Sequence, residues 1–229
     1  MQTIVITGAN RGIGLALTRQ FLQAGHHVVA GCRQPAQAAE LHKLTAAYSL
    51  EIIELDVGAA DSVSLFCQQL GKRAVDVLIN NAGVMGGEHQ GVHDMDYAAW
   101  LHTFEINTLA PFRLATSLIP NLKLAPRPRV LTISSQMGAF GLQMGTGRYA
   151  YRTSKAAVSK VMQVMAQELA SDNIIVCPLH PGWVQTDMGG PGATISAEES
   201  AAGIFKLINN LTMAQSGRFW CWDGNEHVW

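Results

Sequence analysis

Short apolar runs rich in β-branched residues alternate with longer amphipathic stretches along the whole chain. The runs have the length of strands, and the stretches have the length of helices. Strands that alternate with helices are joined by right-handed crossovers, which make neighbouring strands parallel. Strands are predicted at Thr3–Thr7, His27–Gly31, Glu51–Leu55, Val75–Asn80, Arg129–Ser134, Ile174–Leu179 and Arg218–Cys221. Helices are predicted near Ile13–Ala24, Ala36–Ala46, Ser62–Lys72, Tyr97–Leu118, Tyr151–Ala170 and Ala197–Asn209.

The strand runs Ile4–Ile6 and Val77–Ile79 are continuously apolar rather than alternating. Such runs are typical of strands that are covered by helices on both faces of a sheet. No internal repeat or low-complexity linker interrupts the series. The sequence therefore predicts a single α/β domain over residues 1–229, a Rossmann-type doubly wound parallel sheet of about seven strands with helices on both faces.

The charge balance excludes some classes of partner. Sixteen basic residues stand against seventeen acidic ones, for a formal net charge of −1, so no footprint for nucleic acid or an anionic membrane is expected. Charged residues make up only 14% of the chain and apolar residues 48%, which favours a compact fold with further surface covered between subunits.

The cysteines and the start of the chain bear on its location. Four widely spaced cysteines form no C-x-x-C pair, and His89 and His93 lack a third ligand, so neither a disulfide framework nor a metal site is predicted. The first predicted strand begins at Thr3, and no apolar run has membrane-spanning length. A cytoplasmic protein is expected.

A glycine-rich loop follows the first predicted strand and opens the first predicted helix. Gly8 permits a tight exit from the strand, Gly12 lets the backbone approach a pyrophosphate, and Gly14 allows close packing of helix on strand. The helix N-terminus then favours the negative charge of the pyrophosphate. The loop is therefore predicted to bind a dinucleotide through Gly8, Asn10, Arg11, Gly12, Ile13 and Gly14.

Arg33 follows the second predicted strand, where a cofactor with a free ribose 2′-hydroxyl usually meets an acidic residue. Its guanidinium, with that of Arg11 in the adjoining loop, suits a 2′-phosphate instead. NADP(H) is favoured over NAD(H) for this reason.

Tyr151 and Lys155 are spaced i and i+4 in a helical pattern, which places both side chains on one face of the helix. A neighbouring ammonium favours the phenolate and is expected to lower the pKa of Tyr151. A phenol tuned in this way can exchange a proton with an alcohol or carbonyl oxygen.

Together these features resemble the short-chain dehydrogenase/reductase family over nearly the whole chain. Asn80-Asn81-Ala82-Gly83 is similar to the family's N-N-A-G motif, Asp56-Val57 to its adenine-binding pair, and Pro181-Gly182 with Thr186 to the segment over the nicotinamide. Beyond the glycine loop and Arg33, the resemblance implies cofactor contacts from Asp56, Val57, Asn80, Ala82, Gly83, Tyr151, Lys155, Pro181, Gly182, Val184 and Thr186.

The resemblance also implies a catalytic set of Asn107, Ser135, Tyr151 and Lys155. Tyr151 would be the acid/base, Lys155 would lower its pKa and hold the nicotinamide ribose, Ser135 would hydrogen-bond the substrate oxygen, and Asn107 would position a water. Ser134 is the rival serine, although strand alternation turns the two side chains to opposite faces. The gap between Ser135 and Tyr151 is about three residues longer than in the family's common form, which resembles the C-factor and Sniffer branch with its carbonyl reductases.

The function expected is NADPH-dependent reduction of an aldehyde or ketone with an apolar body. The substrate pocket is predicted from Val84–Gly87, Met137–Gly145 and Trp183–Gly192, with a substrate loop near residues 183–196, and its apolar side chains would be Met85, Met137, Phe140, Met144, Trp183 and Met188. The alternative is a non-catalytic NADP(H)-binding regulator of the C-factor type, and a reductase of carrier-bound acyl groups is a third possibility. A homodimer or homotetramer is expected, and the tryptophan-rich tail at residues 217–229 could cap the core, cover substrate or seal an interface.

Overall fold

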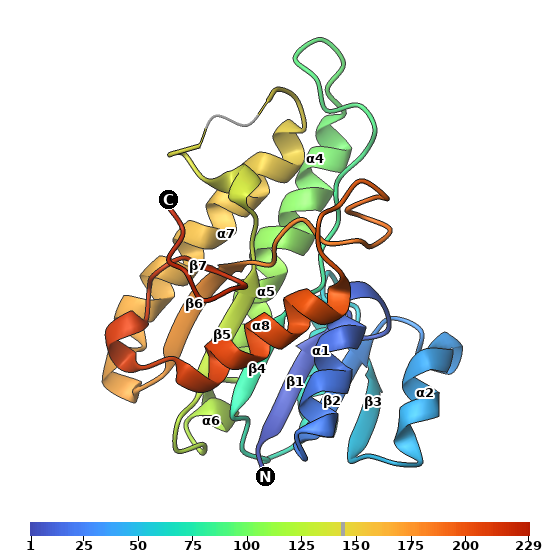
Figure 1. Cartoon of the computed structure of the whole chain (residues 1–229), viewed down its shortest axis with the longest axis vertical. Helices are drawn as coiled ribbons and strands as arrows, with labels where there is room; N and C mark the ends of the chain where they lie inside the picture. Colours follow the sequence, from blue (N-terminus) through green and yellow to red (C-terminus); the bar gives the residue numbers. More distant parts are fainter. Residues whose placement is uncertain (143–144) are drawn as a thin grey trace.

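The computed structural model describes residues 1–142 and 145–229, and its centre is a parallel sheet of seven strands in the order β3-β2-β1-β4-β5-β6-β7 (Figure 1). The predicted doubly wound α/β fold is confirmed, and each observed strand overlaps a predicted one. The strands are β1 (Thr3–Thr7), β2 (His27–Cys32), β3 (Leu50–Glu54), β4 (Val77–Asn80), β5 (Arg129–Ile133), β6 (Ile175–His180) and β7 (Trp220–Cys221).

Helices cover both faces of the sheet because successive residues of each strand point to opposite sides. Ile4 and Ile6 pack in the core beneath α1 and α8, whereas Val5 belongs to the core beneath α3, α5 and α7. The helices are α1 (Gly12–Gln23), α2 (Ala39–Thr45), α3 (Ala60–Leu70), α4 (Tyr97–Phe104), α5 (Ala110–Ser117), α6 (Ile119–Leu122), α7 (Tyr149–Glu168) and α8 (Ala197–Asn210). Short 3-10 turns lie at Pro35–Gln37, Gln136–Gly138, Ala170–Asp172 and Met213–Gln215.

The long helix predicted over Tyr97–Leu118 is confirmed in extent, because residues 97–117 are helical without a gap. A π-helical turn at Glu105–Leu109 lies within it and separates α4 from α5. Pro111 has no N–H, so it cannot donate the i to i−4 hydrogen bond that the carbonyl of Asn107 would receive in a regular helix. The ladder is therefore interrupted at Asn107, and π-helical turns of this kind occur often at functional sites.

Strand order reverses between β1 and β4, which pair in parallel at Ile6 and Ile79. In an open α/β sheet, ligands bind beyond the carboxyl ends of the strands at such a reversal. The glycine loop follows β1, Asn80–Gly83 follows β4, and the loops after β4, β5 and β6 extend from this same end of the sheet (Figure 1). Among the described residues, no helix is long and apolar enough to cross a membrane.

Candidate active site

The glycine loop is folded tightly against the start of α1. Gly8 has a φ of +62°, in the left-handed region that favours glycine. A Cβ at Gly14 would lie 2.3 Å from the carbonyl oxygen of Gly8 and 2.5 Å from Nδ2 of Asn81. The start of α1 thus follows a tight turn that no larger residue could form at these positions, and a helix N-terminus in this setting favours a pyrophosphate.

Asn81 and Thr7 hold this loop, and neither was among the predicted site residues. Asn81 Nδ2 donates to the carbonyl oxygens of Thr7 at 2.9 Å and Gly8 at 3.2 Å. Thr7 Oγ1 accepts from the backbone N–H groups of Asn81 at 3.0 Å and Ala82 at 2.9 Å. The position of Asn81 within the N-N-A-G motif was the signal that could have identified it.

The substrate loop, residues 183–196, folds onto the glycine loop. Thr186 Cγ2 is 3.2 Å from the position that a Cβ on Gly12 would take, and Arg11 Nη1 donates to Asp187 Oδ2 at 2.8 Å. Both partners of this ion pair are largely exposed, so it contributes little to stability and can open to release Arg11. Arg33, the other arginine predicted at the 2′-phosphate, is exposed directly after β2.

Two predicted cofactor residues use their side chains within the protein. Asp56 Oδ1 accepts from the backbone N–H of Gly58 at 3.0 Å, which forms a turn after β3. Asn80 is buried and its Nδ2 donates to Thr132 Oγ1 at 3.2 Å on the neighbouring strand β5. The side chain of Asn80 therefore joins two strands.

Tyr151 and Lys155 lie on the buried face of α7, as their spacing predicts. The Lys155 Nζ donates to the carbonyl oxygen of Ile133 at 2.8 Å and lies 5.7 Å from the centroid of the Tyr151 ring. Burial lowers the pKa of Lys155 to about 8, because the protein interior disfavours its charged form.

The expected direction of the Tyr151 pKa shift was wrong. Burial raises the pKa of Tyr151 above its ordinary value, and the lowering effects of a hydrogen bond with Ser135 and of the Arg148 charge are smaller. Tyr151 lies in the first turn of α7, where its phenol is removed from water. The loss of solvation therefore raises its pKa by more than Ser135 and the Arg148 charge lower it. Tyr151 is therefore held in its protonated form at neutral pH.

The two rival serines have different partners. Ser134 Oγ donates to the carbonyl oxygen of Lys155 at 3.1 Å and lies 2.6 Å from Ser159 Oγ, so it fastens β5 to α7. Ser135 Oγ accepts from the backbone N–H of Met137 at 3.1 Å, and Ser135 is the serine that lies near the phenol of Tyr151 and lowers its pKa. The structure thus brings Ser135, Tyr151 and Lys155 together and directs Ser134 away from them.

Asn107 lies in the π-helical turn and joins the loop after β4 to α7. Its Oδ1 accepts from Val84 N at 2.9 Å, and its Nδ2 donates to Val84 O at 2.8 Å and Ser154 Oγ at 3.0 Å. A Cβ at Gly83 would lie 3.1 Å from Asn107 Oδ1 and 3.5 Å from Lys155 Nζ, which shows how closely these groups approach. The carboxamide is fully used in these bonds, whereas the backbone carbonyl is left without an i+4 donor by Pro111.

Comparison with known proteins decides the family. The sequence model for "short chain dehydrogenase" matches residues 2–194. The chain belongs to the short-chain dehydrogenase family. C-signal of Myxococcus xanthus is 43% identical to it over 155 residues, which are 68% of this chain and 93% of that protein.

Two solved structures are similar to this chain over essentially their whole length. Carbonyl reductase Sniffer of D. melanogaster has a TM-score of 0.94 and 31% identity, with 100% of each chain covered. The NADPH-bound carbonyl reductase from chicken fatty liver has a TM-score of 0.94 and 30% identity, with 100% of this chain and 99% of the other covered. The resemblance to the C-factor and Sniffer branch is confirmed.

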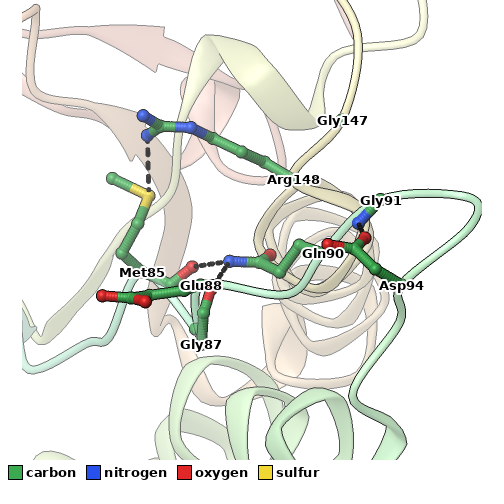
Figure 2. A pocket seen from close by; sticks show the side chains of 9 residues that line it. Met85, Gly87, Glu88, Gln90, Gly91, Asp94, Gly147 and Arg148 are labelled. Atoms are coloured by element: carbon green, nitrogen blue, oxygen red, sulfur yellow. Dashed lines mark hydrogen bonds between the residues drawn. The ribbon is translucent and has the colours of Figure 1, made fainter.

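A cavity of about 460 Å³ opens between the loop after β4 and the start of α7 (Figure 2). Met85–Gly87 line it as predicted, but Met137, Phe140, Trp183 and Met188 do not, and Met144 lies outside the described residues. Glu88, Asp94 and Arg148 contribute charged groups to its wall, so the cavity is more polar than the sequence predicted.

The C-terminal tail, residues 217–229, packs beside the loop that carries Ser135. The His180 Nδ1 accepts from the backbone N–H of Gln136 at 3.3 Å, and the His180 ring meets that of His227 at a centroid distance of 5.5 Å. The backbone N–H of Gly141 donates to the carbonyl oxygen of Trp229 at 2.6 Å, and Trp220 is buried beside β6. The tail therefore caps the core and contacts the loop after β5.

Lowering the pH from 6.5 to 4 is expected to destabilise the protein through His180. Burial and the neighbouring His227 lower its pKa to about 4 from 6.5, against an opposing effect of Asp223. Between these values the unfolded chain binds the proton and the folded one does not, so stability falls as the pH falls, by about 3 kcal/mol in all. Chemical denaturation at several pH values measures this, and an equal pH dependence in His180→Asn would contradict it.

Proposed function

We propose that the protein is an NADPH-dependent carbonyl reductase that converts an aldehyde or ketone to an alcohol, with Tyr151 as the proton donor. One observation carries the proposal: the hydroxyl of Ser135 lies close enough to the buried phenol of Tyr151 to lower its pKa, beside Lys155 and next to a glycine loop at the reversal of the sheet. Similarity to two carbonyl reductases over the whole chain supports the reaction class.

The glycine loop and Arg33 fit a phosphorylated dinucleotide. The close approach of Gly14 to Gly8 leaves backbone N–H groups for a pyrophosphate, and Arg33 is exposed where a 2′-phosphate would lie. The similar chicken enzyme holds NADPH. When bound, the reduced nicotinamide supplies the hydride for the carbonyl carbon. Asp56 and Val57 would border the adenine, and Gly182, Val184 and Thr186 would border the nicotinamide.

The side chains of the site would complete the reduction at the carbonyl oxygen. Negative charge develops there in the transition state, and hydroxyl donors from Ser135 and Tyr151 stabilise it. A raised pKa keeps Tyr151 protonated at neutral pH, which is the form that can deliver a proton to the developing alkoxide. Lys155 would hold the ribose from its anchor on Ile133, and Asn107, whose carbonyl has no i+4 donor, would hold a water near Lys155.

The second candidate is a non-catalytic NADP(H)-binding regulator, because C-signal is 43% identical over 68% of this chain. The arrangement of Ser135, Tyr151 and Lys155 weighs against it, since a sensor has no need of a buried phenol beside a serine. NADPH absorbance with a panel of aldehydes, ketones and quinones separates the two. Oxidation of NADPH is expected with at least one class, and tight binding without turnover would support the regulator.

Replacing Arg33 by Asp is expected to weaken NADPH binding by about tenfold to a hundredfold, the usual value of a charge-assisted hydrogen bond. NADH binding provides the internal control, because it lacks the 2′-phosphate and should be unchanged or stronger. Fluorescence titration of both cofactors measures the change. Equal loss of affinity for NADPH and NADH would contradict the role given to Arg33.

A further inference from the structure

The buried side chain of Gln90 lies between the cavity wall and the start of α7 (Figure 2). Its Nε2 donates to the carbonyl oxygens of Met85 at 3.0 Å and Gly87 at 2.6 Å. Its Oε1 accepts from the backbone N–H of Tyr151 at 3.1 Å, across 61 positions of sequence. Both the nitrogen and the oxygen of this amide therefore have hydrogen-bond partners. These bonds link the loop after β4 to α7, the helix that carries Tyr151.

The first turn of α7 lacks a cap from its own N-cap residue. Arg148 stands at the N-cap with a left-handed φ of 55°, and its side chain makes no cap hydrogen bond. The earliest N–H groups of a helix have no intrahelical acceptor and need another partner. Gln90 supplies two acceptors for these N–H groups. Its backbone oxygen accepts from Tyr149 N at 3.4 Å, and its side-chain oxygen accepts from Tyr151 N.

The orientation of the amide is fixed by its surroundings. Nε2 faces two carbonyl oxygens and Oε1 faces an N–H, so exchanging the two atoms would lose all three bonds. A Cβ at Gly86 would lie 2.9 Å from Nε2, which shows that the loop is wrapped closely around the amide. A small movement of Met85–Gly87 would therefore displace the amide of Gln90 and, with it, the first turn of α7.

We propose that Gln90 is a positioning residue for carbonyl reduction. From the loop after β4 it caps the first turn of α7, the helix that carries Tyr151. In this way it sets the position of Tyr151 relative to Ser135. The loop that forms the wall of the cavity is thereby coupled to the proton donor. The kinetic part of this inference depends on the proposed function, whereas the capping part does not.

The test compares Gln90→Leu with Asn121→Leu. Asn121 is a matched control, because its buried amide donates to the carbonyl oxygens of Gly71 and Arg73, both at 2.7 Å, next to the amino end of β4. Gln90→Leu is expected to lower kcat by about tenfold to a hundredfold, as misplacement of a reacting group does, with cofactor affinity within about twofold. Asn121→Leu should lose stability and keep its kcat.

Two further readouts distinguish positioning from a loss of stability. A displaced Tyr151 moves away from Ser135, whose hydroxyl lowers its pKa, so the apparent pKa in the kcat/KM profile should move upward in Gln90→Leu. Hydrogen exchange should accelerate in the first turn of α7 in Gln90→Leu and not in Asn121→Leu. The exchange measurement requires no turnover, so it decides the capping role even if every carbonyl in the panel proves inert.

Gln90→Glu separates the cap from the two bonds to carbonyl oxygens. It keeps an oxygen for the Tyr151 N–H, and its charge is favourable at a helix N-terminus, so exchange in α7 should remain near wild type and kcat should exceed that of Gln90→Leu. If Gln90→Leu does not fold, Gln90→Met takes its place. Equal kcat losses in the Gln90 and Asn121 variants, or unchanged exchange in α7, would overturn the proposal.

Discussion

Replacing Tyr151 by Phe is expected to lower the rate of carbonyl reduction by about 10²–10⁴-fold, the range found for removal of a general acid. The phenol is buried near Ser135 and protonated at neutral pH, and Phe retains the ring without the hydroxyl proton. The ring still fills its place in α7, so NADPH affinity and the free energy of unfolding should change little.

Steady-state oxidation of NADPH with the best carbonyl of the panel measures the loss, and fluorescence titration measures cofactor binding. Tyr149→Phe is the matched control, because this tyrosine lies two residues earlier in the same helix and its side chain is exposed. Its activity should remain within about twofold of wild type. Full activity in Tyr151→Phe would remove the phenol from the mechanism.

Gly14→Ala is expected to lower NADPH affinity by at least about a hundredfold, the second large effect. The added Cβ would lie 2.3 Å from the carbonyl oxygen of Gly8, a backbone atom that can move only if the glycine loop moves. The displacement would also break the hydrogen bonds from Asn81 Nδ2 to the carbonyl oxygens of Thr7 and Gly8. The free energy of unfolding should therefore fall by about 1–3 kcal/mol.

A control variant, Gly71→Ala, separates the loss of NADPH affinity from the loss of stability. Gly71 ends α3 with a φ of +65° and has open space around it, so alanine there introduces backbone strain without a clash. Its stability should fall by about 1 kcal/mol while NADPH affinity is retained. Titration calorimetry with NADPH and chemical denaturation measure both variants, and wild-type affinity in Gly14→Ala would contradict the geometry of the loop.

The sheet could be predicted because its determinants are local. Runs such as Ile4–Ile6 give the strands, and the i, i+4 spacing of Tyr151 and Lys155 places both on one face of α7. The irregular turn within the predicted helix over Tyr97–Leu118 could also have been anticipated, because Pro111 stands four residues after Asn107. A proline at that spacing removes a hydrogen bond of the helix wherever it occurs.

The remaining features depend on packing between distant segments. The sign of the Tyr151 pKa shift follows from burial, which adjacent residues do not reveal. Gln90 meets α7 across 61 positions, and Asn81 meets Thr7 across 74, so neither contact has a local pattern. The charged groups of the cavity wall have no local pattern either, because Glu88 and Arg148 come from two loops that the fold brings together.

Transfer of deuterium from NADPH labelled at C4 of the nicotinamide tests the central claim most directly. The purified protein is incubated with each of the two C4-labelled epimers and the panel of carbonyl compounds, and the products are examined by mass spectrometry. We predict that one epimer places deuterium on the carbinol carbon of an alcohol, and that Tyr151→Phe binds the same cofactor but forms no labelled product. Tight NADPH binding without label in any product would contradict the account.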